Sequence, residues 1–311
     1  MEKNSKIYIA GHTGLVGSAI VRCLQSNGYN NLVCRDIKDL DLRRQAEVED
    51  FFAQEKPEYV FLSAAKVGGI LANNTYPAQF IYDNLMIATN IIHSAYLSKV
   101  KKLLFLGSSC IYPKFASQPI KEEYLLTGSL EPTNEAYAIA KITGLELCKF
   151  YRREYGCDFI SAMPTNLYGI NDNFDLETSH VLPALIRKFH EAKVADKEEV
   201  VLWGTGSPKR EFLFVDDLAD ALLFLMLNYT EEDPVNVGPG EDIAIRDLAR
   251  IVQELTEFNG KVVYDTTKPD GTPRKWLDIT KIHSLGWKHK TELPEGIKKV
   301  YDWYKIVNLK S

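Results

Sequence analysis

The sequence predicts an α/β protein built on a doubly wound, mostly parallel sheet. Short runs of β-branched and aromatic residues alternate with segments whose apolar residues recur at helical spacing. A helix between two strands returns the chain so that the strands lie parallel, with helices covering both faces of the sheet. The predicted strands span 6–10, 31–35, 59–64, 102–107, 158–163, 200–203, 235–237 and 261–264. The predicted helices span 15–26, 45–54, 77–98, 135–155, 181–192, 215–227, 245–257 and, opened by a first-turn proline, 294–306.

The second half of the chain is organised more loosely than the first. After about residue 168, polar loops rich in Gly and Pro occupy 171–175, 204–210 and 268–275. Loops on a rigid scaffold are where binding residues concentrate. We therefore expect a dinucleotide-binding domain and a smaller C-terminal α/β domain that binds a second ligand. The first comprises 1–168, with 200–230 returning to it, and the second comprises 169–199 and 231–311.

Composition limits the classes of partner. Of 311 residues, 45% are hydrophobic and 25% charged, which is typical of a globular protein in water. A net charge of -5 offers no general attraction to nucleic acid or anionic membrane, so neither is expected as a partner. The start of the chain lacks a signal-peptide pattern, and the longest apolar run is too short for a membrane helix. Five cysteines without C-x-x-C spacing indicate reduced thiols, a cytoplasmic location and no metal site.

A glycine-rich turn joins the first predicted strand to the first predicted helix. Its spacing is G-x-x-G-x-x-G, in the strand–turn–helix context that dinucleotide binding requires. Glycines let the backbone approach a pyrophosphate, and the helix N-terminus supplies N–H donors and a positive dipole. The residues expected to bind the cofactor here are Gly11, Thr13, Gly14, Leu15, Val16 and Gly17.

The end of the second predicted strand carries two opposing signals about the cofactor. Asp36 lies 19 residues after Gly17, where an acidic residue would bond the ribose 2′-hydroxyl of NAD. Arg35 and Lys38 could instead contact the 2′-phosphate of NADP, which Asp36 would repel unless its side chain turned away. From the residues alone both cofactors stay open.

Tyr137 and Lys141 are the candidates for proton transfer. They are four residues apart, so they share one face of the predicted helix. A nearby ammonium should stabilise phenolate and lower the tyrosine pKa from about 10 towards working pH. Ser108, at the end of a predicted strand, would hydrogen-bond the reacting oxygen while hydride moves to or from nicotinamide. The same Tyr-Lys spacing recurs at 264/268 and 301/305, but only the first pair follows a strand that ends in serine.

With these residues in place, the chain resembles the extended short-chain dehydrogenase/reductase family, and within it the enzymes that epimerise and reduce GDP-4-keto-6-deoxy-D-mannose. The similar motifs run almost from end to end. They are Ala-Ala-Lys-Val-Gly-Gly-Ile at 64–70, Ala-Asn-Asn-Thr-Tyr-Pro at 72–77, Leu-Gly-Ser-Ser-Cys-Ile-Tyr-Pro-Lys at 106–114, Glu-Pro-Thr-Asn at 131–134, Met-Pro-Thr-Asn-Leu-Tyr-Gly at 163–169, and the segments 179–184, 210–213 and 268–275. The resemblance implies a Rossmann domain and a homodimer joined through the helices at about 77–98 and 135–155.

The resemblance also implies roles for individual residues. Ser108, Tyr137 and Lys141 match the reductase triad, and Cys110 and His180 match the pair that epimerises C3 and C5 beside the C4 ketone. A carbonyl acidifies its α-protons, and the same hydroxyl donors would hold the enolate. A thiol and an imidazole can share proton removal and return near neutral pH.

Binding residues follow from the same resemblance. Basic residues matching diphosphate contacts are Lys188, Arg210 and Lys275, with Trp203 a nucleotide contact and Asp270 a sugar or base contact. Further matching cofactor contacts are Leu106, Gly107, Lys141, Pro164, Asn166, Leu167 and His180. Many bacterial members carry Arg where this chain has Thr13, and another near Ile37, both tied to the NADP phosphate. NADP(H) is favoured because of Arg35 and Lys38 and because the resembled family usually uses it. NAD(H) stays open because of Asp36.

The main functional prediction is NADPH-dependent 3,5-epimerisation and 4-reduction of GDP-4-keto-6-deoxy-D-mannose to GDP-L-fucose. One alternative is a C4 reductase, with or without epimerase activity, for a related GDP-4-keto heptose or dideoxy sugar. An NAD-retaining 4-epimerase or 4,6-dehydratase is disfavoured, since dehydratases of this fold usually carry Asp-Glu where this chain has Ser109-Cys110. A non-enzymatic dinucleotide sensor is also disfavoured, because it would need none of the five catalytic candidates.

Overall fold

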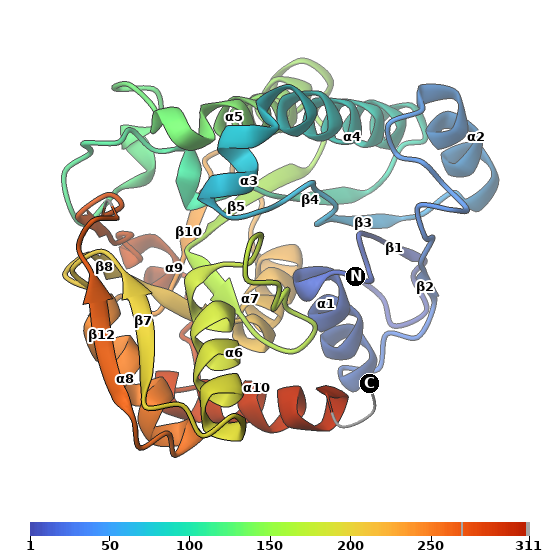
Figure 1. Cartoon of the computed structure of the whole chain (residues 1–311). Helices are drawn as coiled ribbons and strands as arrows, with labels where there is room; N and C mark the ends of the chain where they lie inside the picture. Colours follow the sequence, from blue (N-terminus) through green and yellow to red (C-terminus); the bar gives the residue numbers. More distant parts are fainter. Residues whose placement is uncertain (269, 309–311) are drawn as a thin grey trace.

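A six-stranded parallel sheet forms the centre of the molecule. The computed structural model describes residues 1–268 and 270–308, and its main sheet has the order β10-β5-β4-β3-β1-β2 (Figure 1). All five pairings are parallel, which confirms the predicted doubly wound fold. These strands are β1 (Ile7–Ala10), β2 (Leu32–Val33), β3 (Tyr59–Leu62), β4 (Lys102–Leu106), β5 (Phe159–Pro164) and β10 (Val235–Val237).

Helices cover both faces of this sheet. On one face α2 packs against α4 and α4 against α5, and on the other α1 packs against α7 (Figure 1). Strands β4 and β5 are buried along their whole length, as expected of strands covered on both sides. The helices are α1 (Leu15–Ser26), α2 (Gln45–Glu55), α3 (Ile70–Thr75), α4 (Pro77–Leu97), α5 (Glu135–Tyr155) and α7 (Val215–Asn228).

The rest of the chain packs around a second hydrophobic cluster. Its buried members include Ile186 and Phe189 of α6, Leu248 and Val252 of α8, and Ile297 of α10. The parallel pair β7–β12 flanks this cluster, and the small sheets β11-β8-β13 and β6-β9 lie beside it. The elements are β6 (Asn166–Tyr168), α6 (Val181–Val194), β7 (Glu199–Trp203), β8 (Lys209–Arg210), β9 (Phe212–Phe214), β11 (Ile243–Ala244), α8 (Ile245–Thr256), β12 (Lys261–Asp265), β13 (Arg274–Lys275), α9 (Thr280–Ser284) and α10 (Leu293–Asn308).

The chain passes between the two clusters more than once. After β9, helix α7 and strand β10 return to the first cluster, and β10 extends the main sheet beside β5. Residues 235–237 therefore lie in the main sheet, although they fall within the range expected for the second domain. The exact division of the chain into two domains stays a prediction.

All eight predicted strands and all eight predicted helices correspond to elements of the structure. The bounds 15–26 and 135–155 are reproduced as predicted. No sequence pattern predicted β6, β8, β9, β11, β13, α3 or α9, because segments of two to six residues are too short to show a periodicity. Several of these short elements carry residues of the site.

The carboxyl ends of β1, β3, β4 and β5 lie along one edge of the sheet. Parallel strands place the loops that follow them together, and ligands of such sheets bind at that edge. The glycine turn follows β1, Ser108 follows β4, and Asn166 follows β5. Three sequence-distant candidates are thereby brought to the same edge.

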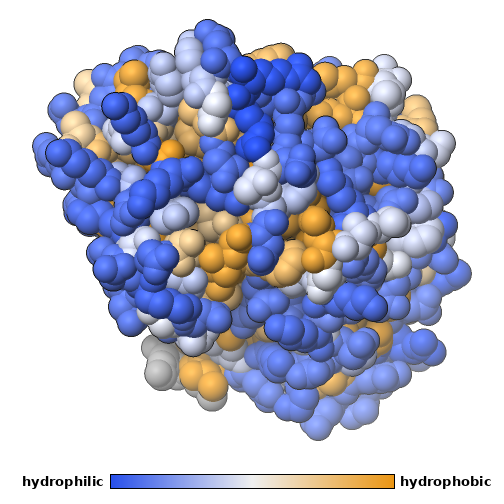
Figure 2. Space-filling model, turned by 180° about the vertical axis from the view of Figure 1, so that it is seen from behind, coloured by the Kyte–Doolittle hydropathy of each residue, from blue (hydrophilic) through white to orange (hydrophobic). Residues whose placement is uncertain are grey.

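The surface is mostly hydrophilic, with apolar residues scattered between polar ones on the face seen from behind (Figure 2). Of the helices in 1–268 and 270–308, none combines the length and apolarity needed to cross a bilayer. Across those same residues, no group of three or more His, Cys, Asp or Glu side chains is placed to hold a metal ion.

Candidate active site

The glycine turn between β1 and α1 is closely packed. Gly11 has φ +86°, and a Cβ there would lie 2.7 Å from the Cα of Ala64. A Cβ on Gly17 would lie 2.0 Å from the carbonyl oxygen of Gly11, so the first turn of α1 can approach β1 only with glycine. A Cβ on Gly14 would meet nothing nearer than 3.5 Å. Gly11 and Gly17 thus fix the turn, while Gly14 leaves space beside it.

The N-terminus of α1 fits a pyrophosphate. The helix begins after Gly14 with no side-chain cap and no acidic residue in its first turn. Its first N–H groups and positive dipole end are therefore free of competing carboxylates within the helix itself. A tight backbone with open space at Gly14 and an uncapped helix start is the arrangement that a dinucleotide cofactor uses.

The three residues that could contact the 2′ position of the cofactor's adenosine ribose differ in their surroundings. The Asp36 side chain is half exposed, and its Oδ1 lies 3.9 Å from Nε2 of His12 in the glycine turn. Arg35 instead forms an ion pair with Glu55 of α2. Lys38 is exposed. The acidic residue thus lies beside the glycine turn, and the arginine is directed towards α2.

Ser108 and Tyr137 meet at the end of β4. Ser108 caps a short 3-10 turn, where its Oγ accepts a hydrogen bond from the N–H of Cys110 at 3.2 Å. Burial raises the pKa of Tyr137, the nearby Cys110 raises it further, and a hydrogen bond with the Ser108 side chain lowers it in part. The serine, the tyrosine and the cysteine are therefore in one hydrogen-bonded and electrostatic group.

Lys141 lies beneath Tyr137 on the same helix face. It is 4% exposed, and its Nζ donates a hydrogen bond of 2.7 Å to the carbonyl oxygen of Leu106, the last residue of β4. The Nζ is 5.9 Å from the centre of the Tyr137 ring. Burial lowers the pKa of Lys141 to about 7.

The expected effect of this ammonium on the tyrosine is not found. Lys141 is not among the groups that shift the pKa of Tyr137, and that pKa is raised rather than lowered. Burial disfavours the charged form of each group, so the phenol and the amine both move towards neutrality. The shared helix face was predicted correctly, but desolvation outweighs the charge effect.

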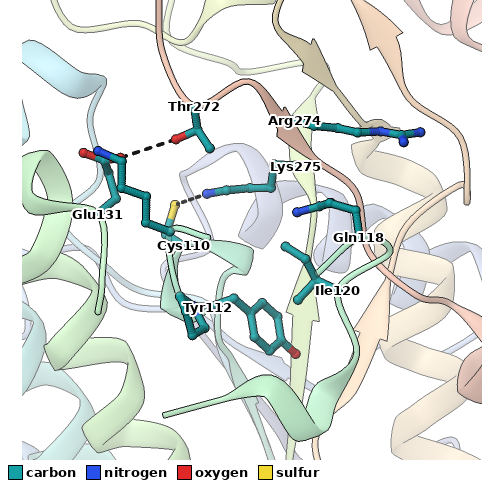
Figure 3. A pocket seen from close by; sticks show the side chains of 10 residues that line it. Cys110, Tyr112, Gln118, Ile120, Glu131, Thr272, Arg274 and Lys275 are labelled. Carbon is teal, nitrogen blue, oxygen red and sulfur yellow. Dashed lines mark hydrogen bonds and ion pairs between the residues drawn. The ribbon is translucent and has the colours of Figure 1, made fainter. Parts of the chain in front are cut away.

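Cys110 faces a pocket together with Lys275, which Figure 3 shows pointing at its sulfur. The Nζ of Lys275 lies 3.7 Å from Sγ of Cys110. Arg210 also interacts electrostatically with Cys110, while burial lowers its own pKa. Residues 210 and 275 are register partners on β8 and β13, so both cations project from the same face of that ladder.

His180 precedes α6 and is exposed. Surrounding protein atoms partly desolvate the imidazole and lower its pKa, so the neutral form prevails at neutral pH. The loop before it rests on the segment before α3: the N–H of Gly69 donates to the carbonyl oxygen of Thr178 at 2.9 Å. A Cβ on Gly69 would lie 2.9 Å from the carbonyl oxygen of Ser179, which explains a glycine there.

Trp203, a predicted nucleotide contact, has a strongly exposed side chain (67%), and the predicted diphosphate contact Lys188 lies beside it. The Nζ of Lys188 lies 6.0 Å from its ring centre and that of Lys268 5.6 Å. Both carboxylate oxygens of Asp270 accept hydrogen bonds from Thr205, at 2.9 Å from the backbone N–H and 2.7 Å from the hydroxyl. Asp270 therefore holds the loop after β7, a structural contact that the sequence did not indicate.

The further predicted cofactor contacts include residues at or just after the ends of β4 and β5. Gly107 donates its N–H to the carbonyl oxygen of Ala162 at 2.8 Å, which keeps the loop after β4 beside β5. Asn166 donates from Nδ2 to the carbonyl oxygen of Glu211 at 2.8 Å. The other members of this set are Leu106 and Pro164, which end β4 and β5, and Leu167, which packs on the first cluster.

Glu211 is a site residue that the sequence reasoning missed. It is fully buried, with Oε1 accepting from the N–H of Gly240 at 2.8 Å and Oε2 from the N–H of Leu277 at 3.1 Å. Burial raises its pKa to about 7. Its carboxyl group ties the segment after β10 to the segment after β13, next to Arg210. The adjacent motif Arg-Glu-Phe-Leu could have drawn attention to it, but a charged residue in a loop-rich segment is ordinarily taken as exposed.

A parallel sheet with a glycine turn after its first strand, and a serine, tyrosine and lysine after its fourth, defines an NAD(P)-dependent enzyme of the short-chain dehydrogenase/reductase type. The chain belongs to the NAD dependent epimerase/dehydratase family, whose model matches residues 7–238.

Individual relatives narrow this class to enzymes of nucleotide sugars. The chain is 64% identical over 303 residues to GDP-L-fucose synthase 1 of Arabidopsis thaliana, covering 97% of this chain and 94% of the relative. It is similar to a solved GDP-mannoheptose C4 reductase from Campylobacter jejuni with NADP bound, at 44% identity and a TM-score of 0.91, covering 98% and 99%. It is also similar to a GDP-L-fucose synthetase from Naegleria fowleri bound to NADP, at 31% identity and a TM-score of 0.92, covering 100% and 97%.

Proposed function

We propose that this protein catalyses the NADPH-dependent 3,5-epimerisation and 4-reduction of GDP-4-keto-6-deoxy-D-mannose to GDP-L-fucose. Full-length similarity to GDP-L-fucose synthases supports the substrate and the product. The observation that carries the chemistry is the group formed by Ser108, Tyr137 and Cys110 at the end of β4. The two hydroxyls proposed to act in reduction and the thiol proposed to act in epimerisation thus lie close together.

The reduction at C4 needs a proton donor for the ketone oxygen, and the cofactor when bound supplies the hydride. Tyr137 suits this role because its raised pKa keeps the phenol protonated at neutral pH. Ser108 would donate a second hydrogen bond to the same oxygen. Lys141 holds its position through Leu106 and, with a pKa of about 7, can pass a proton towards the tyrosine.

The epimerisation needs groups that remove and return protons at C3 and C5. Cys110 and His180 are the proposed pair, and both are accessible side chains rather than core residues. The hydroxyls of Ser108 and Tyr137 would stabilise the enolate oxygen during each exchange. A neutral His180 can act as either proton acceptor or, once protonated, proton donor.

A further group of predicted contacts would bind the GDP part of the substrate. Lys188 and Arg210 are proposed diphosphate ligands, with Trp203 against the nucleoside and Asp270 at its edge. Partial burial lowers the pKa of Lys188, whose Nζ lies beside the Trp203 ring and the carbonyl oxygen of Val201. An anionic diphosphate would restore the stability of its charged form.

The cofactor is NADP(H), which solved relatives at 31% and 44% identity contain. In this chain the glycine turn and the uncapped N-terminus of α1 would hold the pyrophosphate. Asp36 beside His12 favours a ribose hydroxyl, so use of NADH is the alternative to be measured.

The direct test is to incubate the purified protein with GDP-4-keto-6-deoxy-D-mannose and either NADPH or NADH and to identify the sugar by NMR. GDP-L-fucose is expected, formed faster with NADPH. A product reduced at C4 but unchanged at C3 and C5 would favour the C4-reductase alternative, which similarity to the heptose reductase supports. A parallel reaction with a GDP-4-keto heptose would then compare the two substrates.

We further propose a homodimer formed through α4 and α5 and acting in the cytoplasm. Both helices expose large apolar side chains, among them Tyr82 at 54% and Phe150 at 52%. A second copy would cover them, since exposed apolar patches of this kind mark interfaces. All five cysteines are free, as in a reducing compartment. Light scattering after size exclusion should give a dimer mass, and Tyr82→Glu with Phe150→Glu should give monomers.

A further inference from the structure

One cation that contacts the proposed epimerisation thiol has a defined place in the fold. Lys275 lies on β13, and its Nζ is 3.7 Å from Sγ of Cys110 (Figure 3). Lys275 is one of the side chains that line this pocket, and its charged nitrogen contacts the sulfur. The resemblance implies that Lys275 contacts the diphosphate, and in the structure its ammonium also lies beside Cys110.

The backbone around Lys275 is fixed to the segment that follows Cys110. The N–H of Trp276 donates to Oε1 of Gln118 at 2.8 Å, and the carbonyl oxygen of Trp276 accepts from the N–H of Ile120 at 2.7 Å. On its other side, β13 pairs with β8. The main chain that carries Lys275 is therefore held beside the segment that follows Cys110.

Most of the other charges at the pocket are already neutralised. Lys114 pairs with Glu131 at 3.0 Å. Arg274 pairs with Asp242. Within 1–268 and 270–308, Lys275 has no carboxylate partner.

The remaining groups that face Cys110 come from β8 and α5. Arg210 on β8 likewise has no carboxylate partner in the part of the chain that the structure describes, and it interacts with Cys110. Tyr137 on α5 is held in its neutral form by burial. Two cations without carboxylate partners thus lie near the sulfur and the phenol beside it is uncharged, so the charges around Sγ are net positive.

We propose that Lys275 is a positioning residue for epimerisation, which stabilises the anionic sulfur of Cys110 as it accepts a proton from the sugar. This inference rests on the proposed function. In the step, the C–H bond beside the ketone breaks, its proton bonds to Sγ, and its electron pair moves into the enolate. His180, protonated from solvent, gives its proton to the opposite face of the same carbon, which re-forms the C–H bond with inverted configuration and leaves the imidazole neutral. The ammonium stays protonated throughout and lowers the energy of the sulfur anion before and after each transfer.

The test measures the thiol directly in the enzyme without substrate. Iodoacetamide alkylates thiolates, and peptide mass spectrometry resolves Cys110 from the other four cysteines. Lys275→Met and Lys275→Gln should each slow alkylation of Cys110 at pH 7 about tenfold, and should raise the pH of half-maximal rate by about one unit. Lys275→Arg should restore most of the rate.

Lys188→Met is the matched control, because Lys188 is also a proposed diphosphate ligand but contacts Trp203 and Val201 rather than Cys110. It should raise KM for the GDP-sugar and leave alkylation unchanged. If the Lys275 variants retain wild-type alkylation rates while raising KM, Lys275 is a diphosphate ligand only and the proposal is wrong. Thermal unfolding of each variant shows that it is folded. Because alkylation needs no substrate, the effect of Lys275 on Cys110 can be measured even if the protein does not catalyse the proposed reaction.

Discussion

The ammonium of Lys141 is hydrogen-bonded to the carbonyl oxygen of Leu106 at 2.7 Å. This bond fastens α5 to the last residue of β4, and it satisfies both a buried amine and a strand-end carbonyl. Less than one turn further along α5, a Cβ on Gly144 would lie 2.4 Å from the Phe105 ring, so α5 rests directly on the strand. Strand, lysine and tyrosine are consequently held at fixed spacing before any ligand arrives.

Replacing Tyr137 with Phe should abolish reduction at C4. The variant keeps the aromatic ring, whose edge-on contact with Phe80 has centroids 6.5 Å apart, and loses only the hydroxyl bonded to Ser108. Loss of a general acid costs about 10²–10⁴-fold in rate. The assay follows NADPH absorbance with GDP-4-keto-6-deoxy-D-mannose, with unfolding temperature as control. Turnover at the wild-type rate would defeat the reductase assignment.

Replacing Cys110 with Ser should separate the two activities. A serine hydroxyl is too weak an acid to be ionised near neutral pH, so proton removal at C3 and C5 should stop. In D2O, NMR should show no deuterium entering those positions, while C4 reduction of the unepimerised ketone continues. Continued deuterium exchange at C3 and C5 would show that Cys110 does not remove these protons.

Replacing Asp36 with Ser should raise the preference for NADPH over NADH by about tenfold, or ~1.4 kcal/mol. The reason is that Asp36 lies beside His12 of the glycine turn, where its charge would oppose a 2′-phosphate. The ratio of kcat/KM for the two cofactors measures the change. Arg35→Ala is the comparison: its guanidinium is paired with Glu55 and should matter less. An unchanged ratio in the Asp36 variant would mean that this carboxylate does not face the ribose.

Asp172→Asn should stabilise the protein at alkaline pH. Burial raises the pKa of Asp172 to about 7, and its Oδ2 is buried without a hydrogen-bond partner in the described structure. The folded state holds this proton more tightly than the unfolded state, so its contribution to stability is present below about pH 4 and is lost as pH rises to 7. The variant avoids this loss and keeps the acceptor for Asn173.

Urea unfolding measures this difference. The variant should exceed the wild type by about 1–2 kcal/mol at pH 8 and by less at pH 5. Equal stabilities at pH 8 would show that the carboxylate is solvated.

Gly17→Ala should destabilise the fold, because its Cβ would lie 2.0 Å from the carbonyl oxygen of Gly11. Forced overpacking of this kind costs about 1–3 kcal/mol or more. Gly14→Ala is the matched variant: with 3.5 Å to the nearest atom it should fold normally but bind NADPH more weakly. Calorimetry gives both quantities, and equal unfolding temperatures for the two variants would contradict this account.

The parts of the site that the sequence predicted well are those with a local pattern. The glycine turn and the pairing of Tyr137 with Lys141 follow from spacing on one strand–turn–helix or one helix. Contacts between distant segments had no such pattern. The bond from Gly240 to Glu211 joins residues on different loops, and that of Lys275 with Cys110 spans most of the chain. The direction in which the pKa of Tyr137 shifts could not be predicted from the sequence either, because burial is its main cause.

The Trp203 side chain is exposed and lies near Lys188 and Lys268, whereas Trp287 is buried in the core. The fluorescence of Trp203 should fall when a guanine ring stacks against the indole. Intrinsic tryptophan fluorescence should therefore report nucleotide binding without an added label. Stopped-flow mixing with GDP alone would then time the arrival of the nucleotide half, separately from any chemistry on the sugar.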